Sequence, residues 1–173
     1  HVPLLREIGD RFVAAGHEVA LVGGPVRDAF LGRSAPDLDF TTDATPEQTL
    51  QVVGTWADAH WDIGRAFGTI GVRKGPHVLE FTTYRADTYE EDSRKPAVTF
   101  GRDLAQDLVR RDFTVNAMAM RLPSLEFVDL NDGLVDLAAR RLRTPGPAAR
   151  SFSDDPLRML RAARFTAQLG LAP

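Results

Sequence analysis

A short strand that ends at two adjacent glycines and leads directly into a helix restricts the fold of this chain more than any other feature. The strand lies in EVALVGG, residues 18–24, and the helix lies in PVRDAFLG, residues 25–32. The β-branched residues predict the strand, the two glycines end it, and Pro25 has the backbone geometry of a first helical residue. The fold therefore contains both sheet and helix.

The two glycines also permit close contact between the backbone and a ligand. Gly23 and Gly24 allow a triphosphate to approach the amide groups at the start of the helix, and Arg27, one turn further on, can clamp it. The alternative is an ordinary tight turn with a solvated Arg27. The third glycine of a dinucleotide-binding fingerprint is missing, and so is the Gly-Lys-Ser/Thr end of a P-loop.

A second predicted strand, DLDFTTD at residues 37–43, carries two carboxylates on one face. Leu38 and Phe40 alternate with Asp37 and Asp39, and residues two apart on a strand point the same way at roughly 6.5 to 7 Å. Two such carboxylates can share a pair of Mg²⁺ ions, which is the arrangement that nucleotidyl transfer requires. The alternative is the solvated face of an edge strand.

The remaining elements are predicted from periodicity and from turn residues. Helical spacing from Leu4 to Val13 predicts a first helix, which a left-handed Gly16 would end. We expect further helices after the capping box TPEQ at 45–48 and from Pro156 to about Leu169, and partial helix within 104–120. Strands are expected at 69–74, 77–85 and 125–133, a mobile loop at 86–101, and a linker at 144–154.

Composition excludes several classes of function. The chain has no cysteine, so disulfides, zinc–thiolate sites and thiol nucleophiles are ruled out, and a reducing, cytoplasmic location is expected. No apolar run is long enough to span a membrane. The net charge is −3, but the stretch from Arg140 to Arg164 contains seven arginines and only two aspartates. That end either docks a polyanion or forms a solvated helix face.

Five motifs in a fixed order carry a resemblance to a known family. They are LVGGPVRDAFLG, DLDFTTDATPEQ, EFTTYRADTYEEDSRKP, DLVRRDFTVNAMA and DDPLRMLRAARF. In this order the chain resembles the class II tRNA nucleotidyltransferases, or CCA-adding enzymes, and the related bacterial poly(A) polymerases of the polymerase β superfamily. The resemblance implies an α+β fold. Residues 1–146 would form a catalytic head with a mixed sheet flanked by helices, and residues 147–173 would begin a helical neck.

The resemblance also implies roles for the first motifs. The glycine turn with Arg27 would hold the incoming triphosphate, and Asp37 and Asp39 would hold the catalytic Mg²⁺ ions. A third acidic position would fall at Glu80, for which an ion pair with an arginine is the alternative.

The Arg-Arg-Asp segment would recognise the nucleotide and its ribose. The resemblance assigns this role to Arg110, Arg111 and Asp112, together with Asn116. The alternative for these residues is a charge cluster at a helix end.

The Glu-Asp-x-x-Arg motif of the family reads the base edge in place of a template. Asp155 and Arg158 match it, whereas Asp154 stands at the glutamate position, which puts a role for that residue in doubt. Asp155 is also placed to cap the last helix. Arg161 and Arg164 share part of the face of Arg158 and would continue toward phosphates, or else form surface ion pairs.

The implied reaction is attack of a tRNA 3′-hydroxyl on the α-phosphate of CTP or ATP, with pyrophosphate released and Mg²⁺ as cofactor. Poly(A) synthesis, addition of only C or only A, and nucleotide binding without turnover remain alternatives. Small-molecule nucleotidyl transfer would leave the DDPLR segment and the arginine-rich end without a purpose.

Overall fold

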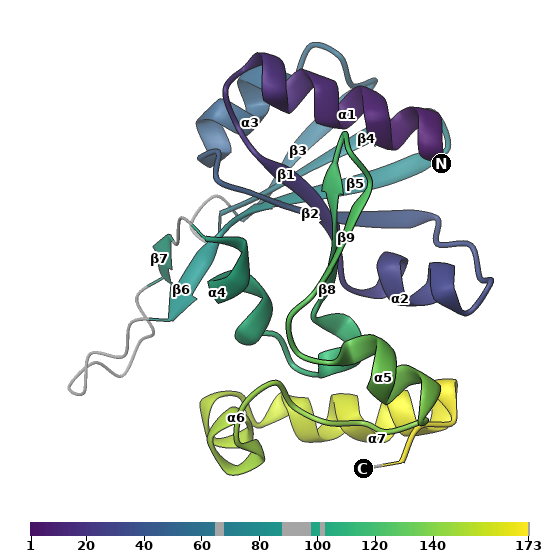
Figure 1. The fold of residues 1–173 in the computed structure, drawn as a ribbon. Helices are drawn as coiled ribbons and strands as arrows, with labels where there is room; N and C mark the ends of the chain where they lie inside the picture. The colour runs from purple at the N-terminus through teal and green to yellow at the C-terminus, as the bar shows by residue number, and fades with distance from the viewer. Residues whose placement is uncertain (65–67, 88–97, 101–102, 173) are drawn as a thin grey trace.

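A mixed sheet of seven strands forms the centre of the computed structural model, which describes residues 1–64, 68–87, 98–100 and 103–172 (Figure 1). Its strands are β1 (Val19–Val22), β2 (Asp37–Thr42), β3 (Ala59–Gly64), β4 (Thr69–Lys74), β5 (His77–Thr83), β8 (Met118–Leu122) and β9 (Glu126–Asp129). The order across the sheet is β3-β4-β5-β2-β1-β8-β9. β2 and β5 run parallel, and the other neighbours run antiparallel. The predicted mixed sheet is confirmed.

Helices cover both faces of this sheet and one of its ends. They are α1 (Val2–Ala14), α2 (Gly24–Phe30), α3 (Pro46–Val53), α4 (Leu104–Val109), α5 (Gly133–Ala138), α6 (Ala148–Asp154) and α7 (Leu157–Leu169), with the short 3₁₀ helix η2 (Thr114–Asn116). α1 and α3 lie together over one face, and α5, α6 and α7 gather below the sheet in Figure 1. No helix in the described ranges is long and apolar enough to cross a membrane.

Alternation along the strands assigns each side chain to a face. Leu38 and Phe40 of β2 are buried in the main core together with residues of α1 and α3, and the ring of Phe40 stacks on Phe81 at 4.7 Å. Asp37 and Asp39 point to the opposite face, where α4 packs through Leu104 and Leu108. The apolar positions of β2 therefore direct both carboxylates toward the face that α4 partly covers.

Two local signals in the sequence are confirmed. Thr45 and Gln48 form the expected capping box of α3, because each side chain accepts a hydrogen bond from the backbone N–H of the other residue. Gly16 has the left-handed conformation expected after α1, with φ at +80°.

Other expectations need correction. Part of the segment predicted as a loop at 86–101 is strand, because β6 (Arg85–Asp87) pairs with β7 (Val98–Phe100); residues 88–97 and 101–102 of that loop lie outside the described residues. The linker expected at 144–154 contains α6. Its Pro and Gly residues precede the helix, and Ala148 and Ala149 are strong helix formers that begin it.

The last helix packs on the core mainly through an aromatic residue, with Ala162 and Leu169 beside it. Phe165 of α7 is 6% exposed, and its ring meets Phe113 edge to face at 5.8 Å. Backbone hydrogen bonds from Leu142 to Ala172 and from Ala172 to Arg140 also join the residues after α7 to the segment that follows α5. These contacts fix the arginines of α7 relative to the sheet.

Candidate active site

The glycine turn between β1 and α2 lies between two arginines. Gly23 has φ of +74°, a conformation that side-chain-bearing residues rarely adopt. A Cβ atom on Gly23 would stand 3.5 Å from Nη1 of Arg111, and one on Gly24 would stand 3.6 Å from Nη2 of Arg27. Because α2 has only seven residues, the two guanidinium groups are the main positive charge at this turn.

Arg27 is held rigidly although it carries a full charge. Its side chain is nearly buried, and it donates from Nη1 to Oδ1 of Asn116 at 2.5 Å and from Nε to Oδ1 of Asp28 at 2.9 Å. Its guanidinium carbon lies 5.5 Å from the centre of the Phe165 ring of α7. Arg27 therefore connects the glycine turn to η2 and to the last helix.

Three carboxylates lie on the sheet face beside this turn. In the parallel pairing of β2 with β5, Asp39 stands directly opposite Glu80, and Asp37 projects from the same face two residues earlier. Glu80 therefore faces the aspartates. No arginine in the described ranges forms an ion pair with it, so the alternative of a structural ion pair is not supported by these residues.

The environment of Asp39 and Glu80 disfavours the charged form of both carboxylates. Asp39 is exposed at the surface, yet the protein around it removes part of its hydration, which raises its pKa; Arg111 opposes that rise, and the charge of Asp37 adds to it. Burial also raises the pKa of Glu80, with further contributions from Asp39 and Asp37. Asp39 and Glu80 are each disfavoured by neighbouring negative charge, and Arg111 offsets part of this at Asp39, so the site is suited to a further positive charge.

These carboxylates fit a Mg²⁺ ion that is bound by protein and nucleotide together better than a metal ion bound by protein side chains alone. Within the described residues, no three acidic, histidine or cysteine side chains come together closely enough to hold one ion. Mg²⁺ is, however, commonly bound by one or two carboxylates, with water and substrate phosphates completing its shell. Asp37 and Asp39 supply that number of protein ligands.

A buried aspartate that the sequence analysis missed orients the two neighbouring arginines. Asp107 of α4 is 0% exposed; its Oδ1 accepts from Nη2 of Arg110 at 3.0 Å, and its Oδ2 accepts from Nη2 of Arg111 at 2.9 Å. It also accepts the backbone N–H of Arg85 at 3.2 Å. The available signal was helical spacing, since Asp107 lies three and four residues before the arginines. The Nε–H of Arg111 is buried without a partner in the described structure, which leaves it an unused donor.

Replacing Asp107 with asparagine is expected to lower the free energy of unfolding at pH 7 by about 2 kcal/mol, because Arg110 and Arg111 lose their anion. Burial alone would raise the pKa of Asp107, but Arg111 and Arg110 hold it below its ordinary value. An acid with a lowered folded-state pKa stabilises the fold above its unfolded pKa of about 3.9, and that contribution is lost as pH falls through the folded value. Urea unfolding should therefore show a difference between parent and variant that shrinks from pH 7 to pH 3. An equal difference at both pH values would contradict this role.

Asp112 and Asn116 are both engaged within the protein. Oδ1 of Asp112 accepts from the backbone N–H of Phe113 and from Nδ2 of Asn116, while Oδ2 pairs with Arg161 at 2.7 Å. Both residues are buried. The structure therefore places Asp112, Asn116 and Arg161 in contact, and Arg161 forms an ion pair, which was the alternative to its predicted approach to phosphates.

The DDPLR segment contacts the Arg-Arg-Asp segment through Arg158. Oδ1 of Asp155 accepts the backbone N–H of Leu157 at 3.0 Å, but the helix begins at Leu157 with Pro156 as its N-cap, so Asp155 lies one residue before the cap position predicted for it. Arg158 donates to the Ser151 hydroxyl at 2.7 Å and to the backbone oxygen of Arg110 at 2.8 Å. Arg164 is exposed, with its guanidinium carbon 5.0 Å from the centre of the Phe165 ring.

Comparison with known proteins agrees with this arrangement. Residues 19–143 match the family described as the Poly A polymerase head domain. The chain is 42% identical over 172 residues to the CCA-adding enzyme of Latilactobacillus sakei (strain 23K), a match that covers 99% of the chain and 41% of that relative. It is 43% identical to the CCA-adding enzyme of Streptococcus suis (strain 05ZYH33), covering 97% of the chain and 40% of the relative.

Solved structures give the same result. The Bacillus stearothermophilus CCA-adding enzyme in complex with CTP superposes with a TM-score of 0.83 at 38% identity, covering 96% of this chain and 40% of that one. The Thermotoga maritima CCA-adding enzyme complexed with tRNA superposes with a TM-score of 0.77 at 28% identity, covering 98% and 38%. The chain thus spans about two fifths of the length of the relatives that it matches. It belongs to the Poly A polymerase head domain family, and both relatives named above, which it matches over almost its whole length, are CCA-adding enzymes.

Proposed function

We propose that this chain is the catalytic head of an enzyme that adds CMP and AMP, from CTP and ATP, to the 3′ end of tRNA. The observation that carries the proposal is the position of Asp37, Asp39 and Glu80 on one face of the sheet, beside Arg111 and the glycine turn. The relatives named CCA-adding enzymes, and their structures with CTP and with tRNA, support the choice of nucleotide and acceptor. We expect the enzyme to act in the cytoplasm.

The proposed reaction exchanges one P–O bond for another and releases a proton. The 3′-hydroxyl oxygen of the RNA gives up its proton to solvent and attacks the α-phosphorus of the nucleotide, and the bond to the bridging oxygen breaks, so that pyrophosphate leaves with the electron pair. Mg²⁺ ions held by Asp37 and Asp39 would supply the charge that activates the hydroxyl and stabilises the leaving group.

The other residues would bind and orient the nucleotide. Arg27 and Arg111 flank the turn at Gly23 and can hold a triphosphate from two sides. Asp155 and Arg158 would offer oxygen and N–H groups to the base edge. Because Arg164 is exposed on α7, its guanidinium is free to approach RNA phosphates.

The proposal is tested by incorporation of labelled CTP and ATP, separately and together with Mg²⁺, into tRNA transcripts that end before, within and after CCA. The assay uses the protein at the full natural length. Ordered addition that stops at CCA is the expected result. Unlimited addition of A would identify a poly(A) polymerase instead. Addition of one nucleotide type alone would identify an enzyme that adds only C or only A. Tight CTP binding without incorporation would indicate a nucleotide-binding module.

A further inference from the structure

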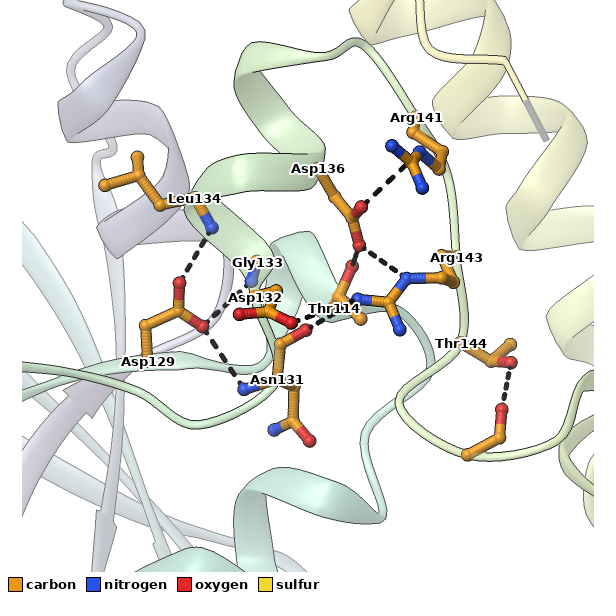
Figure 2. A network of polar contacts seen from close by, with 11 residues as sticks. Thr114, Asp129, Asn131, Asp132, Gly133, Leu134, Asp136, Arg141, Arg143 and Thr144 are labelled. Carbon is orange, nitrogen blue, oxygen red and sulfur yellow. Dashed lines mark hydrogen bonds and ion pairs between the residues drawn. The ribbon is translucent and has the colours of Figure 1, made fainter.

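A buried aspartate outside the proposed site is the centre of a second polar network (Figure 2). Asp136 of α5 is 1% exposed, and its Oδ2 accepts from the Thr114 hydroxyl at 2.6 Å and from Nε of Arg143 at 2.9 Å. Its Oδ1 lies 3.6 Å from Nε of Arg141. Neither the Thr114 hydroxyl nor the Asp136 carboxylate has a part in the reaction proposed above.

The network fixes the position of η2. The backbone N–H of Thr114 donates to the backbone oxygen of Arg143 at 2.8 Å, while its hydroxyl is bound by Asp136. Its carbonyl oxygen lies against Gly133, where a Cβ atom would overlap it. Gly133 is in turn fixed because its N–H donates to Oδ1 of Asp129 at 2.8 Å. Thr114 is therefore held on three sides by the segment from 129 to 143.

The same 3₁₀ helix ends at the residue that holds Arg27. Oδ1 of Asn116 accepts from Nη1 of Arg27, and Nδ2 of Asn116 donates to Oδ1 of Asp112 at 3.1 Å. With one amide atom accepting and the other donating, the side chain of Asn116 has a single orientation. Any shift of η2 would therefore move the oxygen that places the Arg27 guanidinium.

We propose that Asp136 and Thr114 are positioning residues for Arg27. They hold η2 so that Asn116 keeps the guanidinium of Arg27 against the glycine turn, where a triphosphate would bind. The inference rests on the proposed function, because it assigns Arg27 to the nucleotide. It goes further by extending the site to two residues that would not themselves touch the substrate.

Thr114 permits a test that separates positioning from folding. Valine has the shape of threonine without its hydroxyl, and serine keeps the hydroxyl without the methyl group. In Thr114→Val, Asp136 keeps its ion pair with Arg143, so its charge is not left alone. Arg33→Ala is the control background for Arg27→Ala, because Arg33 is an exposed arginine just beyond α2.

Steady-state incorporation of CTP is measured on the protein at the full natural length, with circular dichroism to verify folding. Thr114→Val should raise KM for CTP about tenfold and change kcat less than twofold, since a misplaced Arg27 removes binding shared by ground and transition states. Thr114→Ser should stay within about twofold of the parent. In the Arg27→Ala background the valine change should add less than about twofold, whereas in the Arg33→Ala background the tenfold effect should persist.

The outcomes separate the two claims. An equal effect of Thr114→Val in both backgrounds, or a lowered Tm with unchanged KM, overturns the positioning role and leaves the proposed function intact. If the parent incorporates CTP normally and Arg27→Ala binds CTP as well as the parent does, the positioning role is likewise overturned and the proposed function stands. A parent that neither binds nor incorporates CTP overturns both claims. If Thr114→Val does not fold, Thr114→Ala is judged by the same criteria.

Discussion

Replacing Asp39 with alanine is expected to lower the rate of nucleotide incorporation about a thousandfold, which corresponds to roughly 4 kcal/mol of transition-state stabilisation. Asp39 is central among the three acids, with Asp37 two residues away on its strand and Glu80 opposite on β5. Without its carboxylate, one of the two proposed protein ligands for Mg²⁺ is lost.

The same substitution should not destabilise the fold. Partial loss of hydration and the charge of Asp37 raise the pKa of Asp39 against the opposition of Arg111, so its ionised form is disfavoured in the folded protein. Removing the charge relieves repulsion, and the Tm should stay unchanged or rise. Asp10→Ala is the matched control, because Asp10 is exposed on α1, over the opposite face of the sheet. Incorporation by Asp39→Ala within threefold of the parent would remove Asp39 from the mechanism.

The largest expected effect on stability comes from Gly133→Ala. The new Cβ atom would overlap the carbonyl oxygen of Thr114 and stand 2.8 Å from Cγ of Met118. Thr114 cannot move away freely, because its N–H and hydroxyl are both hydrogen-bonded. We expect a loss of about 3 kcal/mol in the free energy of unfolding, measured by urea denaturation.

The sign of the stability change and a control substitution both help to test this prediction. In the absence of a clash, Gly→Ala inside a helix stabilises by up to about 1 kcal/mol, so the sign of the change is itself informative. Gly146→Ala is the control, because a Cβ atom there meets nothing within 4 Å; it should leave stability unchanged or raise it by about 0.5 kcal/mol. Gly133→Ala as stable as the parent would mean that α5 and η2 do not pack as described.

The features that could be predicted from the sequence are those fixed by neighbouring residues. The glycine turn, the alternation that exposes Asp37 and Asp39, and the capping box at Thr45 each depend on a few adjacent positions, and all are confirmed. The family resemblance is confirmed as well. These local patterns are sufficient to identify Asp37 and Asp39 as the proposed carboxylates without knowledge of their neighbours in the fold.

The remaining features depend on contacts between distant segments. The sequence left Glu80 undecided because a slip of one residue between β2 and β5 would turn it to the other face. The edge strand β3 is defined by its pairing with β4 rather than by a pattern of its own. Asp136 meets Thr114 across 22 residues of chain, and Arg161 meets Asp112 across 49. Pattern alone does not predict such partners.

The most direct test of the account is a crystal structure of the protein with CTP and Mn²⁺, with the metal located by its anomalous scattering. The account predicts metal between the carboxylates of Asp37 and Asp39, and the triphosphate between the Gly23 turn and the guanidinium groups of Arg27 and Arg111. A triphosphate bound elsewhere, or bound at the turn with no metal at either aspartate, would contradict it.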